Sequence, residues 1–90
     1  MPTDAEIKQR IKEIISNVTS VPVEEIGDAD RLRDDLDLDS LSLLEVGVDV
    51  DYEYKLGLPD EELQKIGSVE EAVALVRQVL DRGEGRSEVA

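Results

Sequence analysis

Residues 40–55 read SLSLLEVGVDVDYEYK, and their secondary structure decides the fold class of the whole chain. Residues 46–55 alternate apolar and polar side chains and contain the β-branched and aromatic residues that are typical of a strand. A strand needs a neighbouring strand to satisfy its backbone groups, and the rest of the sequence shows no second strand pattern. We therefore predict that tertiary packing overrides the local preference and that the segment is helical.

As a helix beginning near Ser40, this segment carries two apolar stripes. The first has helical spacing, is expected to face the core and consists of Leu43, Val46, Gly47, Val50 and Tyr54. The second consists of Leu41, Leu44 and Val48, and it is bordered by the acidic residues Glu45, Asp49, Asp51 and Glu53. By pattern alone the second stripe is more typical of core, but a helix face that binds a partner protein has the same appearance. Both interpretations stay open on the pattern alone.

Further helices are predicted on both sides of this segment. Capping-box sequences begin amphipathic helices over 4–18 and 69–82. A proline followed by three acidic residues begins a short helix within 59–67, because proline is tolerated at a helix start and acids suit its positive end. The polar, glycine-containing residues 83–90 are expected to be a disordered tail, which leaves a single domain over 1–82.

The chain is strongly acidic. It has 90 residues, of which 23 are acidic and 10 basic, and the resulting net charge of -13 repels nucleic acid and anionic lipid and attracts basic protein surfaces. Cysteine and histidine are absent from the sequence, which excludes disulfides, thiolate or imidazole metal sites, and Cys–His or Ser–His nucleophilic catalysis. There is no signal-peptide pattern and no run of ~20 apolar residues, so we expect a cytoplasmic protein that binds neither nucleic acid nor membranes.

The residues leading into the central helix, Leu36-Asp37-Leu38-Asp39-Ser40-Leu41, resemble the Leu-Gly-x-Asp-Ser-Leu motif of acyl carrier proteins. The segment Pro59-Asp60-Glu61-Glu62, continuing to Lys65-Ile66, follows the serine at the distance found in typical family members. The resemblance covers residues 4–82 and implies an all-α fold, a small four-helix bundle of three main helices and one short helix.

The resemblance also implies a function. Ser40 would carry a covalent 4'-phosphopantetheine arm, attached by a phosphopantetheinyl transferase for which Asp39 is part of the recognised motif. The arm would hold acyl or polyketide intermediates as thioesters for fatty acid or polyketide biosynthesis. Separate enzymes would perform the chemistry, so the protein would not itself be an enzyme. Without the surrounding motif, a serine after an aspartate at a helix start is most often only a cap.

Two groups of residues acquire expected roles from the same resemblance. Acyl-transfer, synthase and modifying enzymes with basic docking patches are expected to contact a monomer through Leu41, Leu44, Glu45, Val48, Asp49, Asp51, Glu61 and Glu62. For the acidic members of this group, the alternative is a solvated face that maintains solubility. Growing acyl chains are expected to be sheltered between helices and lined by Leu43, Val46, Val50, Ile66 and Val73.

Two positions depart from the family pattern. Asp37 stands where the family usually has glycine, which suggests an unusual backbone conformation that Asp tolerates better than most residues. Lys55 stands where a glycine commonly ends the second helix, and Gly57 follows shortly after it. We therefore expect this chain to differ from its relatives around Ser40, especially at Asp37 and in the strand-like stretch from Val46 to Lys55.

A calcium site, an interaction module and an enzyme are the alternatives to a carrier. The carboxylates of Asp35, Asp37 and Asp39 have the alternate spacing of a calcium loop, but Ser40 and Val46 stand where that loop needs glycine and glutamate. A non-carrier interaction module would keep the helical fold, use the serine only as a cap and bind a basic partner through its acidic helix. An enzyme would have to work with carboxylates alone. The motif is shared by fatty acid, polyketide and specialised carriers, so it does not identify the pathway.

Overall fold

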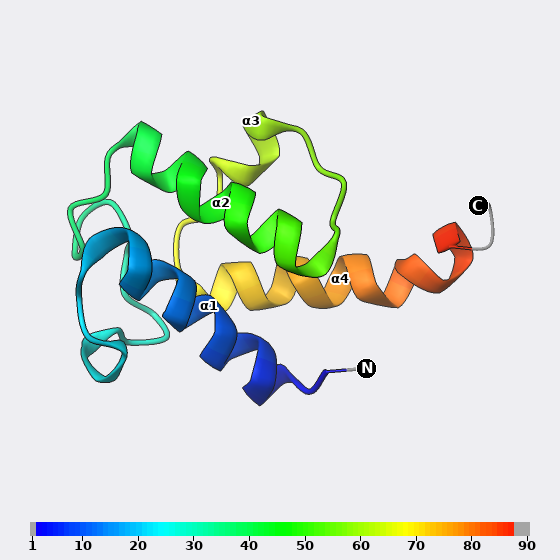
Figure 1. The fold of residues 1–90 in the computed structure, drawn as a ribbon, viewed down its shortest axis with the longest axis horizontal. Coiled ribbons are helices and arrows are strands. Elements are labelled where there is room, and N and C mark those ends of the chain that lie inside the picture. Colours follow the sequence, from blue (N-terminus) through cyan, green and yellow to red (C-terminus); the bar gives the residue numbers. More distant parts are fainter. Residues whose placement is uncertain (1, 88–90) are drawn as a thin grey trace.

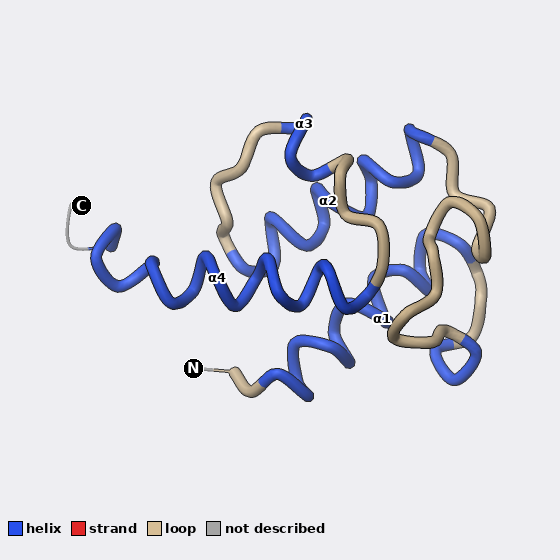
Figure 2. The backbone as a smooth tube through the Cα atoms, turned by 180° about the vertical axis from the view of Figure 1, so that it is seen from behind, coloured by secondary structure: helices blue, strands red, loops and turns tan. Residues whose placement is uncertain are grey.

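The computed structural model describes residues 2–87, with side chains over residues 2–82, as helices joined by loops (Figure 1). In chain order the elements are α1 (Asp4–Thr19), the 3-10 helix η1 (Val23–Glu25), α2 (Ser40–Tyr54), α3 (Asp60–Leu63) and α4 (Val69–Ser87). Figure 2 shows helix and loop but no strand over this part of the chain. The predicted all-α fold of three long helices and one short helix is confirmed.

Helix α1 packs against both α2 and α4, and the short α3 packs against α2. The connection between α1 and α2 wraps around one end of the bundle, at the left of Figure 1, while α4 extends away from it at the other end. The core between the helices is aliphatic, and α1 contributes Ile7, Ile11, Ile14 and Ile15 to it. No helix in the described part of the chain is long and apolar enough to cross a membrane.

The central segment is helical, so tertiary packing overrides its strand-like alternation as predicted. Leu43, Val46 and Val50 are at most 4% exposed, and Tyr54 is half-buried against the same core. In a helix the first stripe therefore faces one continuous apolar core, and every interior backbone group is bonded within the segment. A strand in this position would have left those backbone groups without partners.

Gly47 lies at a close contact between α2 and α3. A Cβ added at Gly47 would be 2.6 Å from the Cβ of Leu63 and 3.0 Å from its carbonyl oxygen, and Leu63 itself is buried. Glycine in a helix interior costs about 1 kcal/mol relative to alanine. The close approach of α3 explains why a residue without a side chain is nevertheless found at this position.

The long loop between α1 and α2 is anchored to the core at several points. Ile26, Leu32 and Leu38 are at most 4% exposed. The backbone N–H of Leu32 donates to the carbonyl of Gly67 over 3.0 Å, and that of Leu38 donates to the carbonyl of Leu32 over 2.9 Å. The loop is therefore held in one shape beside the start of α4, even though it has little regular structure of its own.

Lys55, which stands where a glycine commonly ends this helix in the family, is the C-cap of α2. Lys55 adopts the left-handed conformation at φ 54°, and Gly57 follows at φ 71°. The carboxylate of Asp51 accepts hydrogen bonds from the backbone N–H of Gly57 over 2.8 Å and of Leu58 over 3.2 Å. An acidic side chain from the last turns of the helix thus stabilises the chain reversal.

Helix α4 continues beyond its predicted end at residue 82 and is helical as far as Ser87. The expected tail over residues 83–90 stays a prediction, and residues 88–90 lie outside the described part of the chain. Glycine disfavours a helix interior by about 1 kcal/mol, but once a helix exists each added residue gains a backbone hydrogen bond. No proline follows residue 82 to stop this propagation.

Candidate functional site

Ser40 is the first residue of α2, and its side chain is exposed at the end of the bundle where the long loop meets that helix. The Nη2 of Arg33 donates a hydrogen bond to the Oγ of Ser40 over 2.9 Å. The hydroxyl is therefore open to solvent, stands at the positive end of a helix macrodipole and has a guanidinium beside it. All of these features favour a negatively charged group on this oxygen.

Asp39 is the N-cap of α2 and fixes where the helix begins. The backbone N–H of Ser42 donates to Oδ1 of Asp39 over 2.8 Å, and this hydrogen bond lowers the pKa of the Asp39 carboxyl below its ordinary value. The carboxylate thus accepts a hydrogen bond from the helix backbone. Ser40 presents its hydroxyl next to it at the first position of the helix.

The loop immediately before the serine has the unusual backbone predicted for it. Asp37, at the position where the family usually has glycine, is in the left-handed region at φ 59°. Leu36 on one side is half-buried and Leu38 on the other is 4% exposed, so the left-handed residue lets both leucines turn towards the core. Aspartate replaces glycine here without a change of conformational class because its short polar side chain tolerates this region.

The second apolar stripe of α2 is at the surface. Leu41 is 67% exposed and Val48 is 43% exposed, while Leu44 is half-buried. With Asn17 and Val18 of α1 and the acidic Glu45 and Asp49, these residues line a groove of about 530 Å³ between the two helices. The stripe is therefore not core, and the structure brings five of the predicted partner-binding residues together on one face.

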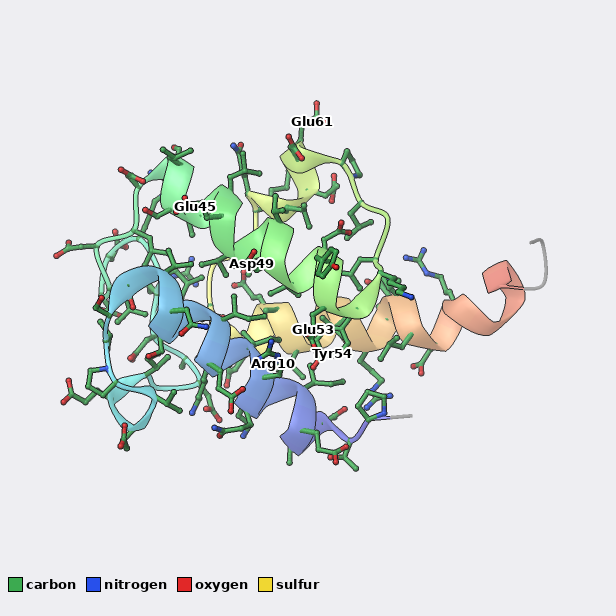
Figure 3. The ribbon with its side chains drawn as sticks, in the orientation of Figure 1. Arg10, Glu45, Asp49, Glu53, Tyr54 and Glu61 are labelled. Atoms are coloured by element: carbon green, nitrogen blue, oxygen red, sulfur yellow. The ribbon has the colours of Figure 1, made fainter. Side chains whose placement is uncertain are left out.

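The other acidic residues predicted to bind partners are placed differently. Figure 3 shows Glu45, Asp49 and Glu53 in order along α2, with Glu61 pointing away from the bundle on α3. Glu53 borders the second stripe but is not one of the predicted partner-binding residues, and it accepts from Arg10 of α1 over 3.1 Å. Two members of the predicted set also have partners within the chain, because Asp51 closes the turn after α2 and Glu62 pairs with Lys65 over 3.3 Å.

The residues predicted to line a sheltered acyl chain do not all lie together in the core. Leu43, Val46, Val50 and Ile66 are buried in the core between the helices. Val73 is only half-buried and lines a groove of about 750 Å³ between α1 and α4. Leu43 also lines a separate hollow of about 210 Å³ between the loop and the segment after α3, close to Arg33.

Arg33 is the residue at this site that the sequence reasoning missed. The available signal was a basic residue inside an acidic run, but a contact with the serine requires the loop to fold back on itself. As for metal ions, the described residues include no group of three or more acidic side chains arranged to hold one.

Comparison with known proteins gives the same picture. Residues 9–76 match the family described as phosphopantetheine attachment site. An acyl carrier protein of Petrotoga mobilis is 38% identical over 79 residues, which cover 88% of this chain and 93% of that protein. The meromycolate extension acyl carrier protein of Mycobacterium tuberculosis is 38% identical over 77 residues, covering 86% of this chain and 67% of that protein.

A solved structure is similar to this chain in fold and in sequence. The acyl carrier protein from Enterococcus faecalis superimposes with a TM-score of 0.68 at 31% identity, covering 83% of this chain and 95% of that one. The family match spans the loop, the serine and most of the helices, and the relatives align over most of the chain. The chain therefore belongs to the acyl carrier protein family and is a carrier of fatty acid or polyketide intermediates on a covalently attached 4'-phosphopantetheine.

Proposed function

We propose that Ser40 is the residue that carries the phosphopantetheine arm. The observation that carries this proposal is the exposed hydroxyl of Ser40 at the start of α2, inside the matched segment and next to a guanidinium. Attachment would join Oγ of Ser40 to the phosphorus next to the pantetheine of coenzyme A and release the adenosine bisphosphate part. The hydroxyl proton would go to a base of the transferase, because this chain has no histidine or cysteine and Asp39 is engaged with the helix backbone.

The test is to incubate the purified protein with a phosphopantetheinyl transferase and coenzyme A and to measure its intact mass. We expect the wild type to gain one phosphopantetheine and Ser40→Ala to gain none. Ser42→Ala is the matched control, since it removes a neighbouring hydroxyl while its backbone N–H still bonds to Asp39. A mass gain that survives Ser40→Ala would contradict the proposal.

We propose further that partner enzymes dock on the groove between α1 and α2, with Leu41 and Val48 as apolar contacts and Glu45 and Asp49 as charged ones. Their exposure and the net charge of the chain support basic, partly apolar patches on those enzymes. The chain would act as a monomer in the cytoplasm, where coenzyme A is available for loading, and would leave catalysis to its partners.

The docking proposal can be tested by measuring association with a synthase or transferase at several salt concentrations. Charge reversal by Glu45→Lys should lower the association rate and weaken its salt dependence. Glu24→Lys makes the same charge change at an exposed residue of η1 that does not line this groove, and it should have a smaller effect. Equal effects of the two reversals would mean that only net charge matters and that the groove is not the docking surface.

Sheltering of the acyl chain remains our proposal for the core residues Leu43, Val46, Val50 and Ile66, together with Val73. Leu43 supports it, because this side chain belongs to the core and also lines the hollow close to Arg33. If a long acyl chain enters between the helices, the acylated protein should unfold at a higher temperature than the form with a free thiol. Equal melting temperatures would contradict sheltering.

A further inference from the structure

Arg33 differs from the neighbouring cation Arg31 in its partners. Arg31 pairs with Glu71 over 3.5 Å. Among the residues that the structure describes, Arg33 forms no ion pair with a carboxylate, and its side chain donates to the Oγ of Ser40. In a chain with a net charge of -13, a guanidinium that bonds to a neutral hydroxyl is an unusual use of a positive charge.

The fold of the loop explains how this contact forms. Leu32 is fully buried and Leu38 nearly so, and the hydrogen bond between their backbones closes the loop between them. This closure brings Arg33 back towards the start of α2, although it precedes Ser40 by seven positions. The two core anchors therefore hold the loop backbone that brings the exposed side chain of Arg33 within reach of Ser40.

The surroundings of Ser40 would otherwise oppose a new negative charge. The loop carries the exposed carboxylates of Asp34, Asp35, Asp37 and Asp39. Attachment of the arm replaces the hydrogen of a neutral hydroxyl by a phosphodiester with one negative charge, and like charges repel each other. A cation already bonded to the same oxygen is what such a site needs.

We propose that Arg33 is a positioning residue that ion-pairs with the phosphodiester of the arm on Ser40, an inference that rests on Ser40 being the attachment site. A guanidinium has five donors in a planar fork that suits phosphate oxygens, so the donors left free by the hydroxyl contact can bind them. Arg33 also lines the hollow of about 210 Å³ that contains Leu43 and Lys65. The ion pair would hold the first atoms of the arm beside that hollow.

The experiment measures, for each variant at low salt, the melting temperatures of the unmodified and of the arm-bearing protein and compares the two. In Arg33→Gln, the change in melting temperature on attachment of the arm should be about 2–4 °C less favourable than in the wild type. This size follows from the usual strength of exposed ion pairs and from the response of small domains to such changes in stability. Arg33→Lys should keep part of the wild-type value, because it retains the charge but not the fork. At about 0.5 M salt the difference should shrink, since exposed charges are then screened.

Arg82→Gln is the matched control. It removes the same charge from an exposed position in α4, at the other end of the bundle from the start of α2, and should behave as the wild type does (Figure 1). Intact mass measured on every sample separates the assignment of Ser40 from the role of Arg33. No mass gain in the wild type would overturn the assignment of Ser40 and this inference with it. A complete mass gain with the same melting shift in wild type and Arg33→Gln would overturn the role of Arg33 alone.

Discussion

The two apolar stripes of α2 are made of similar residues on one helix, yet they have opposite environments. Leu43 and Val46 are 4% and 1% exposed, whereas Leu41 and Val48 are 67% and 43% exposed. Hydrophobicity does not distinguish them, because leucine and valine occur in both. The difference is that α3 and the core cover the first stripe, while the second lies at the rim of an open groove beside α1. Exposed apolar side chains at such a groove are typical of a surface that binds other proteins.

Two leucines, one from each stripe, provide the most sensitive test of this difference. Leu43→Ala should lower the free energy of unfolding by ~2–5 kcal/mol, because it leaves a cavity in the core. Leu41→Ala should change it by less than ~0.5 kcal/mol and should instead weaken association with partner enzymes. Urea denaturation and partner-binding assays measure both quantities. Similar losses of stability in the two variants would mean that the second stripe is also part of the core.

Gly47 provides a second test of the buried stripe, at its contact with α3. Gly47→Ala places a Cβ 2.6 Å from that of Leu63, and overpacking of this kind costs ~1–3 kcal/mol, partly offset by the ~1 kcal/mol gained from helix propensity. We therefore expect a net loss of stability in urea denaturation. Val48→Ala, at the next position but on the open face, is the control and should be nearly neutral. A stabilised Gly47→Ala would show that α3 moves away easily.

A smaller effect concerns the cap that sets where α2 begins. The hydrogen bond from Ser42 lowers the pKa of Asp39 in the folded state, so the ionised cap contributes stability above the unfolded pKa, near 3.8, and loses it as the pH falls through the folded value. Asp39→Ala should therefore melt at a lower temperature than the wild type at pH 7. The gap should narrow in melting curves recorded below pH 3.8. A gap that is constant with pH would mean that the charge of the cap is irrelevant.

The smallest expected effect concerns the ion pair that joins α1 to the end of α2. Arg10 donates to Glu53 over 3.1 Å, and the two side chains are 42% and 38% exposed. Solvent screens such pairs, so Arg10→Gln should cost only ~0.2–1 kcal/mol. Raising the salt concentration should reduce the difference from the wild type in urea denaturation. A cost that does not respond to salt would point to lost packing of the arginine stem rather than to the charge pair.

Much of the site was predictable because its signals are local in sequence. The motif around Ser40, the capping sequences and the left-handed tendency at Asp37 all act within a few residues, and the structure has the expected helices and backbone at these positions. The use of Asp51 in the turn after α2 was not predicted, since its partners lie beyond the helix. The contact of Arg33 with Ser40 was missed because it depends on buried leucines that close the loop.

By itself the sequence determined the family, the helix order, the position of the serine and the presence of two apolar stripes on α2. Periodicity, caps and motif spacing suffice for these, because each depends on residues close together in the chain. Three features required the folded chain: the exposure of the second stripe, the close contact of Gly47 with Leu63, and the cation that reaches Ser40. The physical reason is that burial and ion pairing are properties of neighbours in space, and chain closure around the aliphatic core selects those neighbours.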